Sequence, residues 1–244
     1  MRNIKMTLEY DGTDYSGWQR QPNARSVQET LESAIAAVTG ESVRVTGAGR
    51  TDAGVHALAQ VASFGTSSHL TAGELKAAIN ANLPDDASVL DLEEAPAEFD
   101  AQRSARGKTY AYSILNRMER SPLLRRTALL VNQQLDIGAM RRAARFIRGE
   151  HDFACFRSAG SSAKTSVRRV THLDIEERDG LLFITVSADG FLYNMVRAIV
   201  GTLIEVGRGK MSPEDLPDII SSRDRARAGP TAPPHGLCLM AVDY

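Results

Sequence analysis

The order of predicted strands and helices indicates an α+β protein in which one order, β-α-β-β-α-β, occurs twice. Alternating polar and apolar residues mark the strands, and apolar residues three or four positions apart mark the helices. This order of elements is typical of ferredoxin-like units. We therefore expect two ferredoxin-like halves, residues 1–104 and 105–244, that form one extended, mainly antiparallel sheet with a central active-site cleft.

In the first half, two helices begin with recognisable capping signals. Ser26 stands three residues before Glu29, and Thr71 stands three residues before Glu74, as in a capping box. Each pair precedes an apolar stripe of helical period. The helices are expected over residues 26–39 and 71–81, and the strands over residues 4–10, 42–48, 57–66 and 88–94.

In the second half, a hairpin and a long apolar helix are the strongest signals. The turn residues Arg178, Asp179 and Gly180 separate two alternating segments, which predicts an antiparallel pair. Gly149 follows an amphipathic segment and indicates where that helix stops. The strands are expected over residues 109–115, 167–177, 181–188 and 236–242, and the helices over residues 137–147, 191–206 and 213–222.

The composition is that of an ordinary globular protein. The chain has 244 residues, of which 43% are hydrophobic and 24% charged. No apolar run approaches the roughly 18 residues of a membrane helix, and residues 1–10 lack a signal-peptide core. Cys155 and Cys238 stand far apart, which argues against a disulfide framework or a thiolate metal site. We expect a cytoplasmic protein with no membrane contact and no metal.

The net charge of −1 conceals an uneven distribution of charge along the chain. Residues 1–100 carry 7 basic and 15 acidic side chains, whereas residues 101–170 carry 15 basic and 4 acidic ones. Arg141, Arg145 and Arg148 fall on one face of their expected helix. Such a basic surface suits a phosphate backbone, although a solvated face without a partner has the same composition.

The decapeptide Gly47–His56, Gly-Ala-Gly-Arg-Thr-Asp-Ala-Gly-Val-His, is the strongest indication of chemistry. It places Asp52 and Arg50 in a glycine-rich loop between two expected strands, where an ionised side chain can face a cleft. The loop lacks the third glycine of a dinucleotide fingerprint and the Lys-Ser/Thr of a phosphate loop. By position alone, Asp52 could also be a turn residue, and Arg50 could be an ion-pair partner.

The decapeptide and several other segments resemble the tRNA pseudouridine synthase A family. The likeness runs in order through nearly the whole chain. Besides Gly49–His56, the matching motifs are Tyr10-Asp11-Gly12, Tyr15-Ser16-Gly17-Trp18-Gln19-Arg20-Gln21, Ser26-Val27-Gln28, Asn80-Ala81-Asn82-Leu83-Pro84, Lys108-x-Tyr110-x-Tyr112, Gly149-x-x-Asp152-Phe153 and Phe191-x-x-Asn194-Met195-Val196-Arg197-x-Ile199-Val200-Gly201.

The resemblance implies an isomerase that converts uridine to pseudouridine at positions 38–40 of the tRNA anticodon stem-loop and works as a homodimer. Asp52 matches the family's nucleophile, which acts on a flipped-out uridine. Tyr110 matches the tyrosine that stacks on the target base, and Arg197 matches a basic residue that pairs with the catalytic aspartate. Arg50 would bind phosphate or help to displace the base.

The reaction needs no cofactor, because an isomerisation involves no net redox change. One position departs from the family: Gln102 stands where an arginine is common, which puts one RNA contact in doubt. A non-catalytic module that binds structured RNA is the alternative, although such a module gains nothing from an aspartate that faces phosphates. A glycosidase would need a second acid, and the nearest N-terminal to Asp52, Glu41, is eleven residues away.

Overall fold

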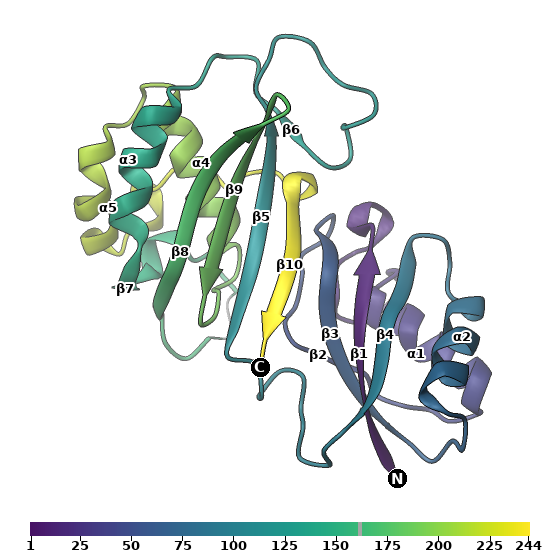
Figure 1. Ribbon diagram of the computed structural model, residues 1–244. Coiled ribbons are helices and arrows are strands. Elements are labelled where there is room, and N and C mark those ends of the chain that lie inside the picture. The colour runs from purple at the N-terminus through teal and green to yellow at the C-terminus, as the bar shows by residue number, and fades with distance from the viewer. Residues whose placement is uncertain (161–162) are drawn as a thin grey trace. The chain divides into compact units, whose positions relative to one another are not determined.

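A computed structural model describes residues 1–160 and 163–244, and the chain forms two compact units (Figure 1). The first unit contains Met1–Arg106 together with Cys238–Tyr244, and the second contains Gly107–Leu237. The predicted α+β class with mainly antiparallel sheets is confirmed. By packing, the C-terminal strand belongs to the first unit, although it follows the second in sequence.

The first unit has a sheet with helices α1 (Val27–Thr39) and α2 (Ala72–Asn82) on one face (Figure 1). Its strand order is β4-β1-β3-β10; β10 runs parallel to β3, and the other pairs are antiparallel. Alternate side chains of β1 are buried, as its sequence pattern predicts. The strands are β1 (Arg2–Tyr10), β2 (Thr46–Gly47), β3 (His56–Thr66), β4 (Ala87–Ala95) and β10 (Leu237–Asp243), and a short helical turn η1 (Gly12–Asp14) follows β1.

The second unit has an antiparallel sheet in the order β5-β9-β8-β7, and β6 pairs in parallel with β5. Its longest helices pack on one face of this sheet, and α4 is buried along most of its length (Figure 1). The strands are β5 (Gly107–Leu115), β6 (Leu129–Leu130), β7 (Gly149–Asp152), β8 (Val167–Arg178) and β9 (Leu181–Ala188), and the helices are α3 (Ile137–Ile147), α4 (Met195–Gly207) and α5 (Leu216–Ser222). Short turns are η2 (Phe153–Phe156), η3 (Pro213–Asp215), η4 (Arg225–Arg227) and η5 (Pro234–Gly236).

The strand predicted over residues 42–48 is wrong except at Thr46–Gly47. The backbone of Val45 instead bonds to side chains of helix α1. The Glu32 carboxylate accepts from its N–H at 3.0 Å, and the Gln28 amide donates to its carbonyl at 2.8 Å. Because these side chains satisfy the backbone, the segment needs no partner strand here.

The long helix predicted over residues 191–206 begins only at Met195. Asn194 has a left-handed backbone with φ of 60°, which separates residues 191–193 from the helix. The helix predicted over residues 213–222 is likewise divided, into the turn η3 and the helix α5.

Two of the three arginines of the predicted basic stripe, Arg141 on α3 and Arg148 directly after it, are exposed and also bond to the sheet. Arg141 donates through Nε to the Ile175 carbonyl at 2.9 Å, and Arg148 donates through Nε to the Leu173 carbonyl at 2.9 Å. Strand β7 pairs only with the start of β8, so these guanidinium groups satisfy carbonyls along the rest of that edge.

Candidate active site

Asp52 lies in the loop between β2 and β3, and its side chain is half-buried. Val55 donates its N–H to the Asp52 carbonyl at 3.1 Å, which closes a tight turn just before β3. The side chain of Arg50, two residues earlier in the same loop, is exposed. Buried His56 accepts at Nδ1 from the Gly12 N–H at 3.1 Å, a contact that ties the end of the loop to η1.

The segment that follows β1 holds the loop in place around Asp52. Trp18 donates its N–H to the Thr51 carbonyl at 3.0 Å, and Gly54 donates to the Tyr15 carbonyl at 3.4 Å. The hydroxyls of Tyr10 and Thr51 share a buried hydrogen bond of 2.8 Å. Asp52 therefore stands between two residues whose backbones are fixed to another segment, which limits its movement.

Gly17 explains how the two segments come so close. Its φ is 96°, and a Cβ atom there would lie 2.8 Å from the Thr51 carbonyl oxygen. Both the backbone conformation and the contact exclude a larger residue. The glycine in the Tyr-Ser-Gly-Trp motif thus positions the residue that precedes Asp52.

Gln60 and Tyr10 form a buried polar support under the loop. The Gln60 amide donates to the Gly49 carbonyl at 3.0 Å and to the Tyr10 hydroxyl at 3.5 Å. Burial, which outweighs the hydrogen bonds of the hydroxyl, raises the pKa of Tyr10 to about 12, so the phenol is neutral at pH 7. Sequence reasoning missed Gln60, although a glutamine inside an apolar strand is itself a signal.

In the second unit, Tyr110 lies on β5 with only 7% of its surface exposed. Its ring meets Phe191 edge to face, with centroids 5.2 Å apart and an interplanar angle of 88°. Phe191 lies in the non-helical segment that precedes α4. The aromatic pair sets the plane of the tyrosine ring.

Arg197 lies in the first turn of α4, and two hydrogen bonds fix its guanidinium plane. Its Nε donates to the Ala232 carbonyl at 2.7 Å, and its Nη1 donates to Asn194 Oδ1 at 2.7 Å. The Asn194 amide in turn donates to Ser158 Oγ at 3.0 Å. Asn194, with its left-handed backbone conformation, therefore helps to orient the Arg197 guanidinium.

Gly201 brings the carbonyl of Ala232 within reach of Arg197. A Cβ atom at Gly201 would lie 1.7 Å from the Pro230 carbonyl oxygen, so only glycine lets this segment lie directly on α4. The Ala232 N–H donates to the Arg197 carbonyl at 3.0 Å, which fixes the segment from its other side.

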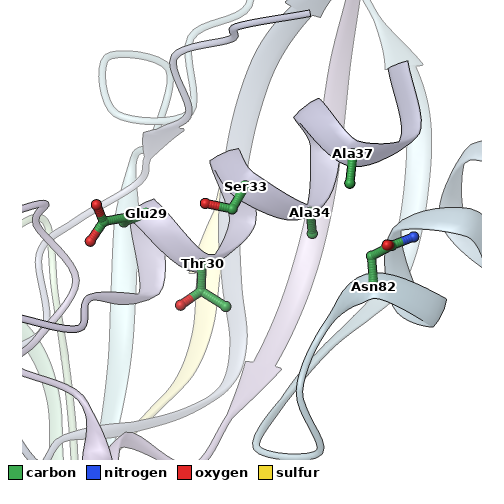
Figure 2. A pocket seen from close by; sticks show the side chains of 6 residues that line it. All are labelled: Glu29, Thr30, Ser33, Ala34, Ala37 and Asn82. Carbon is green, nitrogen blue, oxygen red and sulfur yellow. The ribbon is translucent and has the colours of Figure 1, made fainter. Parts of the chain in front are cut away.

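A cavity of about 320 Å³ opens between α1 and α2, and none of its lining residues belongs to the Asp52 loop (Figure 2). It is lined by Glu29, Thr30, Ser33, Ala34, Ala37 and Asn82. Within residues 1–160 and 163–244, no group of three His, Cys, Asp or Glu side chains could hold a metal ion. No helix in the same ranges is long and apolar enough to cross a membrane.

The geometry thus gives two sets of residues: Asp52 and Arg50 on a braced loop of one unit, and Tyr110 and Arg197 in the other. A family model described as tRNA pseudouridine synthase matches residues 6–102 and 143–244. The chain belongs to the tRNA pseudouridine synthase family, so the resemblance seen in the sequence is confirmed.

The full-length relatives agree with the family model. The chain is 51% identical to tRNA pseudouridine synthase A of Acetivibrio thermocellus and 50% identical to tRNA pseudouridine synthase A of Caldicellulosiruptor bescii, with 100% of both chains covered in each case. A solved chain of a Cbf5-Nop10-Gar1 complex aligns with 97% of this chain and 58% of its own length, at 12% identity and a TM-score of 0.34. That likeness is too weak to bear on the site.

Proposed function

We propose that the protein isomerises uridine to pseudouridine at positions 38–40 of the tRNA anticodon stem-loop, as a cytoplasmic homodimer without a cofactor. The observation that carries this proposal is its membership of the family over nearly the whole chain, including the loop that holds Asp52. The joining of the two sets of residues into one central cleft is part of the proposal.

The bond changes explain why one carboxylate is enough. The N1–C1′ glycosidic bond of uridine breaks, the uracil turns, and a C5–C1′ bond forms. The hydrogen on C5 leaves as a proton, and N1 gains one, so atoms and electrons balance without an oxidant or reductant. A nucleophile is needed to hold the intermediate while the base turns, and an ionised carboxylate can form that temporary bond.

Asp52 is the nucleophile, and Arg197 is the basic residue that pairs with it. The bonds from Arg197 to Ala232 and Asn194 orient its charge in advance, so little reorganisation is needed during the reaction.

Tyr110 and Arg50 receive the flipped nucleotide. Extrusion of a base from its stack costs a few kcal/mol, which stacking on Tyr110 and contacts to phosphate offset. Because Tyr110 is braced by Phe191, it offers the uracil a fixed surface. The exposed guanidinium of Arg50 can reach a phosphate or occupy the place that the base leaves.

Incubation of the protein with tRNA transcripts, followed by chemical mapping of pseudouridine, tests the proposal. The wild type should form pseudouridine at one or more of positions 38–40, and Asp52→Asn should form none while it binds tRNA with an unchanged Kd. A wild type that binds tRNA but forms no pseudouridine would identify the alternative, a non-catalytic RNA-binding module. Activity in the Asn variant would remove Asp52 from the mechanism.

A further inference from the structure

Lys108 is a half-buried cation without a bonding partner among the described residues. It lies on β5 two residues before Tyr110, so both side chains project from the same face of the strand. Burial, together with the nearby Arg168 charge, lowers the pKa of Lys108 from its ordinary value. Partial burial of an ammonium group with no acceptor is costly, which makes the lack of a partner for Lys108 informative.

Arg168 lies on the same face of the sheet as Lys108. In the strand register, Lys108 pairs with Ala188, and Ala188 pairs with Val170, two residues after Arg168 on β8. The Arg168 side chain packs against Gly190, where an added Cβ atom would lie 3.4 Å from its Nε. Only Nη1 has acceptors within the described ranges, on Thr165 and Val167.

The acidic residues closest to Lys108 and Arg168 in sequence and strand register, Glu150 and Asp189, bond to Arg169. The Glu150 carboxylate forms an ion pair with the Arg169 guanidinium at 3.1 Å. Asp189 accepts from the Arg169 backbone N–H at 3.0 Å. Lys108 and Arg168 are therefore two like charges, and neither forms an ion pair in the part of the chain that the structure describes.

We propose that Lys108 and Arg168 together bind one phosphodiester group of the RNA strand, next to the uridine that stacks on Tyr110. An anion between the two cations relieves their repulsion and supplies the acceptor that Lys108 lacks. Lys108 and Tyr110 lie about 7 Å apart along the strand, so the phosphate belongs to the target nucleotide or its neighbour. This inference rests on the proposed function, which gives Tyr110 its role.

Binding of a stem-loop RNA by the full-length protein at several salt concentrations tests the pair. Lys108→Gln and Arg168→Gln should each raise Kd about ten-fold and make the salt dependence of binding shallower, because a phosphate contact is lost. Lys108→Arg should retain the wild-type salt dependence. Arg169→Gln is the matched control: this neighbour has its own acid, so Kd should change less than about two-fold.

A neutral methylphosphonate, placed in turn on either side of the target uridine, locates the contact. At one of the two positions, the methylphosphonate should weaken binding by the wild type about as much as Lys108→Gln weakens binding to normal RNA. The same methylphosphonate should not weaken binding by Lys108→Gln any further. The inference would be overturned if the variants lost as much affinity as the wild type at both methylphosphonate positions. It would also be overturned if the variants bound normal RNA as tightly as the wild type. Pseudouridine formation by the wild type on the same RNA is measured separately, so a failure of the proposed function is distinguished from a failure of this phosphate site.

Discussion

Gly201→Ala should destabilise the second unit and displace the arginine of the proposed active site. The new methyl group would lie 1.7 Å from the Pro230 carbonyl oxygen, so helix α4 and residues 229–232 must separate by more than about 1 Å. Both partners are backbone, and no side-chain rotation can relieve the contact. The shift weakens the mutual hydrogen bonds of Arg197 and Ala232, at 2.7 and 3.0 Å.

The expected loss is about 3 kcal/mol of unfolding free energy, from overpacking and the weakened hydrogen bonds. For a protein of this size, that loss lowers Tm by roughly 6–12 °C. Thermal unfolding followed by circular dichroism measures it. Gly73→Ala on α2 is the control, because no atom lies within 4 Å of the added methyl group; its Tm should stay the same or rise.

A Tm for Gly201→Ala that matches the wild type would refute the close approach of this segment to α4. A variant that unfolds earlier yet retains full turnover at 25 °C would show that the Ala232 carbonyl does not position Arg197. The combination of a lower Tm and a lower kcat is the expected result.

Three further changes probe the contacts of Tyr10, Asp86 and Arg197. Tyr10→Phe removes the 2.8 Å bond to Thr51 and should cost about 1–2 kcal/mol in denaturant unfolding, with a fall in kcat. Burial tends to raise the pKa of Asp86, but its bonds from Arg25 and Tyr15 outweigh this and lower the pKa. The ionised Asp86 carboxylate therefore stabilises the fold at pH 7, and this contribution is lost as the pH falls below the ordinary aspartate pKa near 4. Asp86→Asn should be about 1 kcal/mol less stable than the wild type at pH 7, and the difference in unfolding free energy should vanish in acid. Arg197→Lys retains the charge but loses the planar fork, and should lower kcat about 10–100-fold with little change in the Kd for tRNA.

Each of these three predictions has its own contrary result. Wild-type stability of Tyr10→Phe would mean that its hydroxyl contributes nothing to the loop. A constant difference between Asp86→Asn and the wild type from pH 7 to pH 2 would exclude the carboxylate's ionisation as the cause. Full turnover by Arg197→Lys would show that a point charge suffices in place of the fixed guanidinium.

Elements that depend on their own residues could be predicted from the sequence. Helix α3 has the predicted bounds, Ile137–Ile147, because its apolar stripe ends at Ile147 and Gly149, which has a positive φ, follows two residues later. Thr71 and Glu74 form the expected capping box at α2. In these cases the pattern and the structure agree because the decisive contacts are only three or four residues apart.

Features that depend on distant partners could not be predicted in this way. The apolar period continues through Phe191 and Leu192, yet contacts of Asn194 with Ser158 and Arg197 set the start of α4. The motifs identify Asp52 and Arg197 as candidates, but not the bonds that hold them. Several of those bonds join residues that are far apart in the sequence, such as Ala232 with Arg197 and Thr51 with Tyr10.

The most direct test of the central claim is single-turnover release of tritium from tRNA labelled at C5 of uridine, because each pseudouridine formed frees one C5 hydrogen. The wild type should release tritium in proportion to the pseudouridine formed, and Asp52→Asn should be slower by roughly 10⁴-fold or more at saturating protein. Release by Asp52→Asn within ten-fold of the wild-type rate would contradict the assignment of Asp52 as the nucleophile.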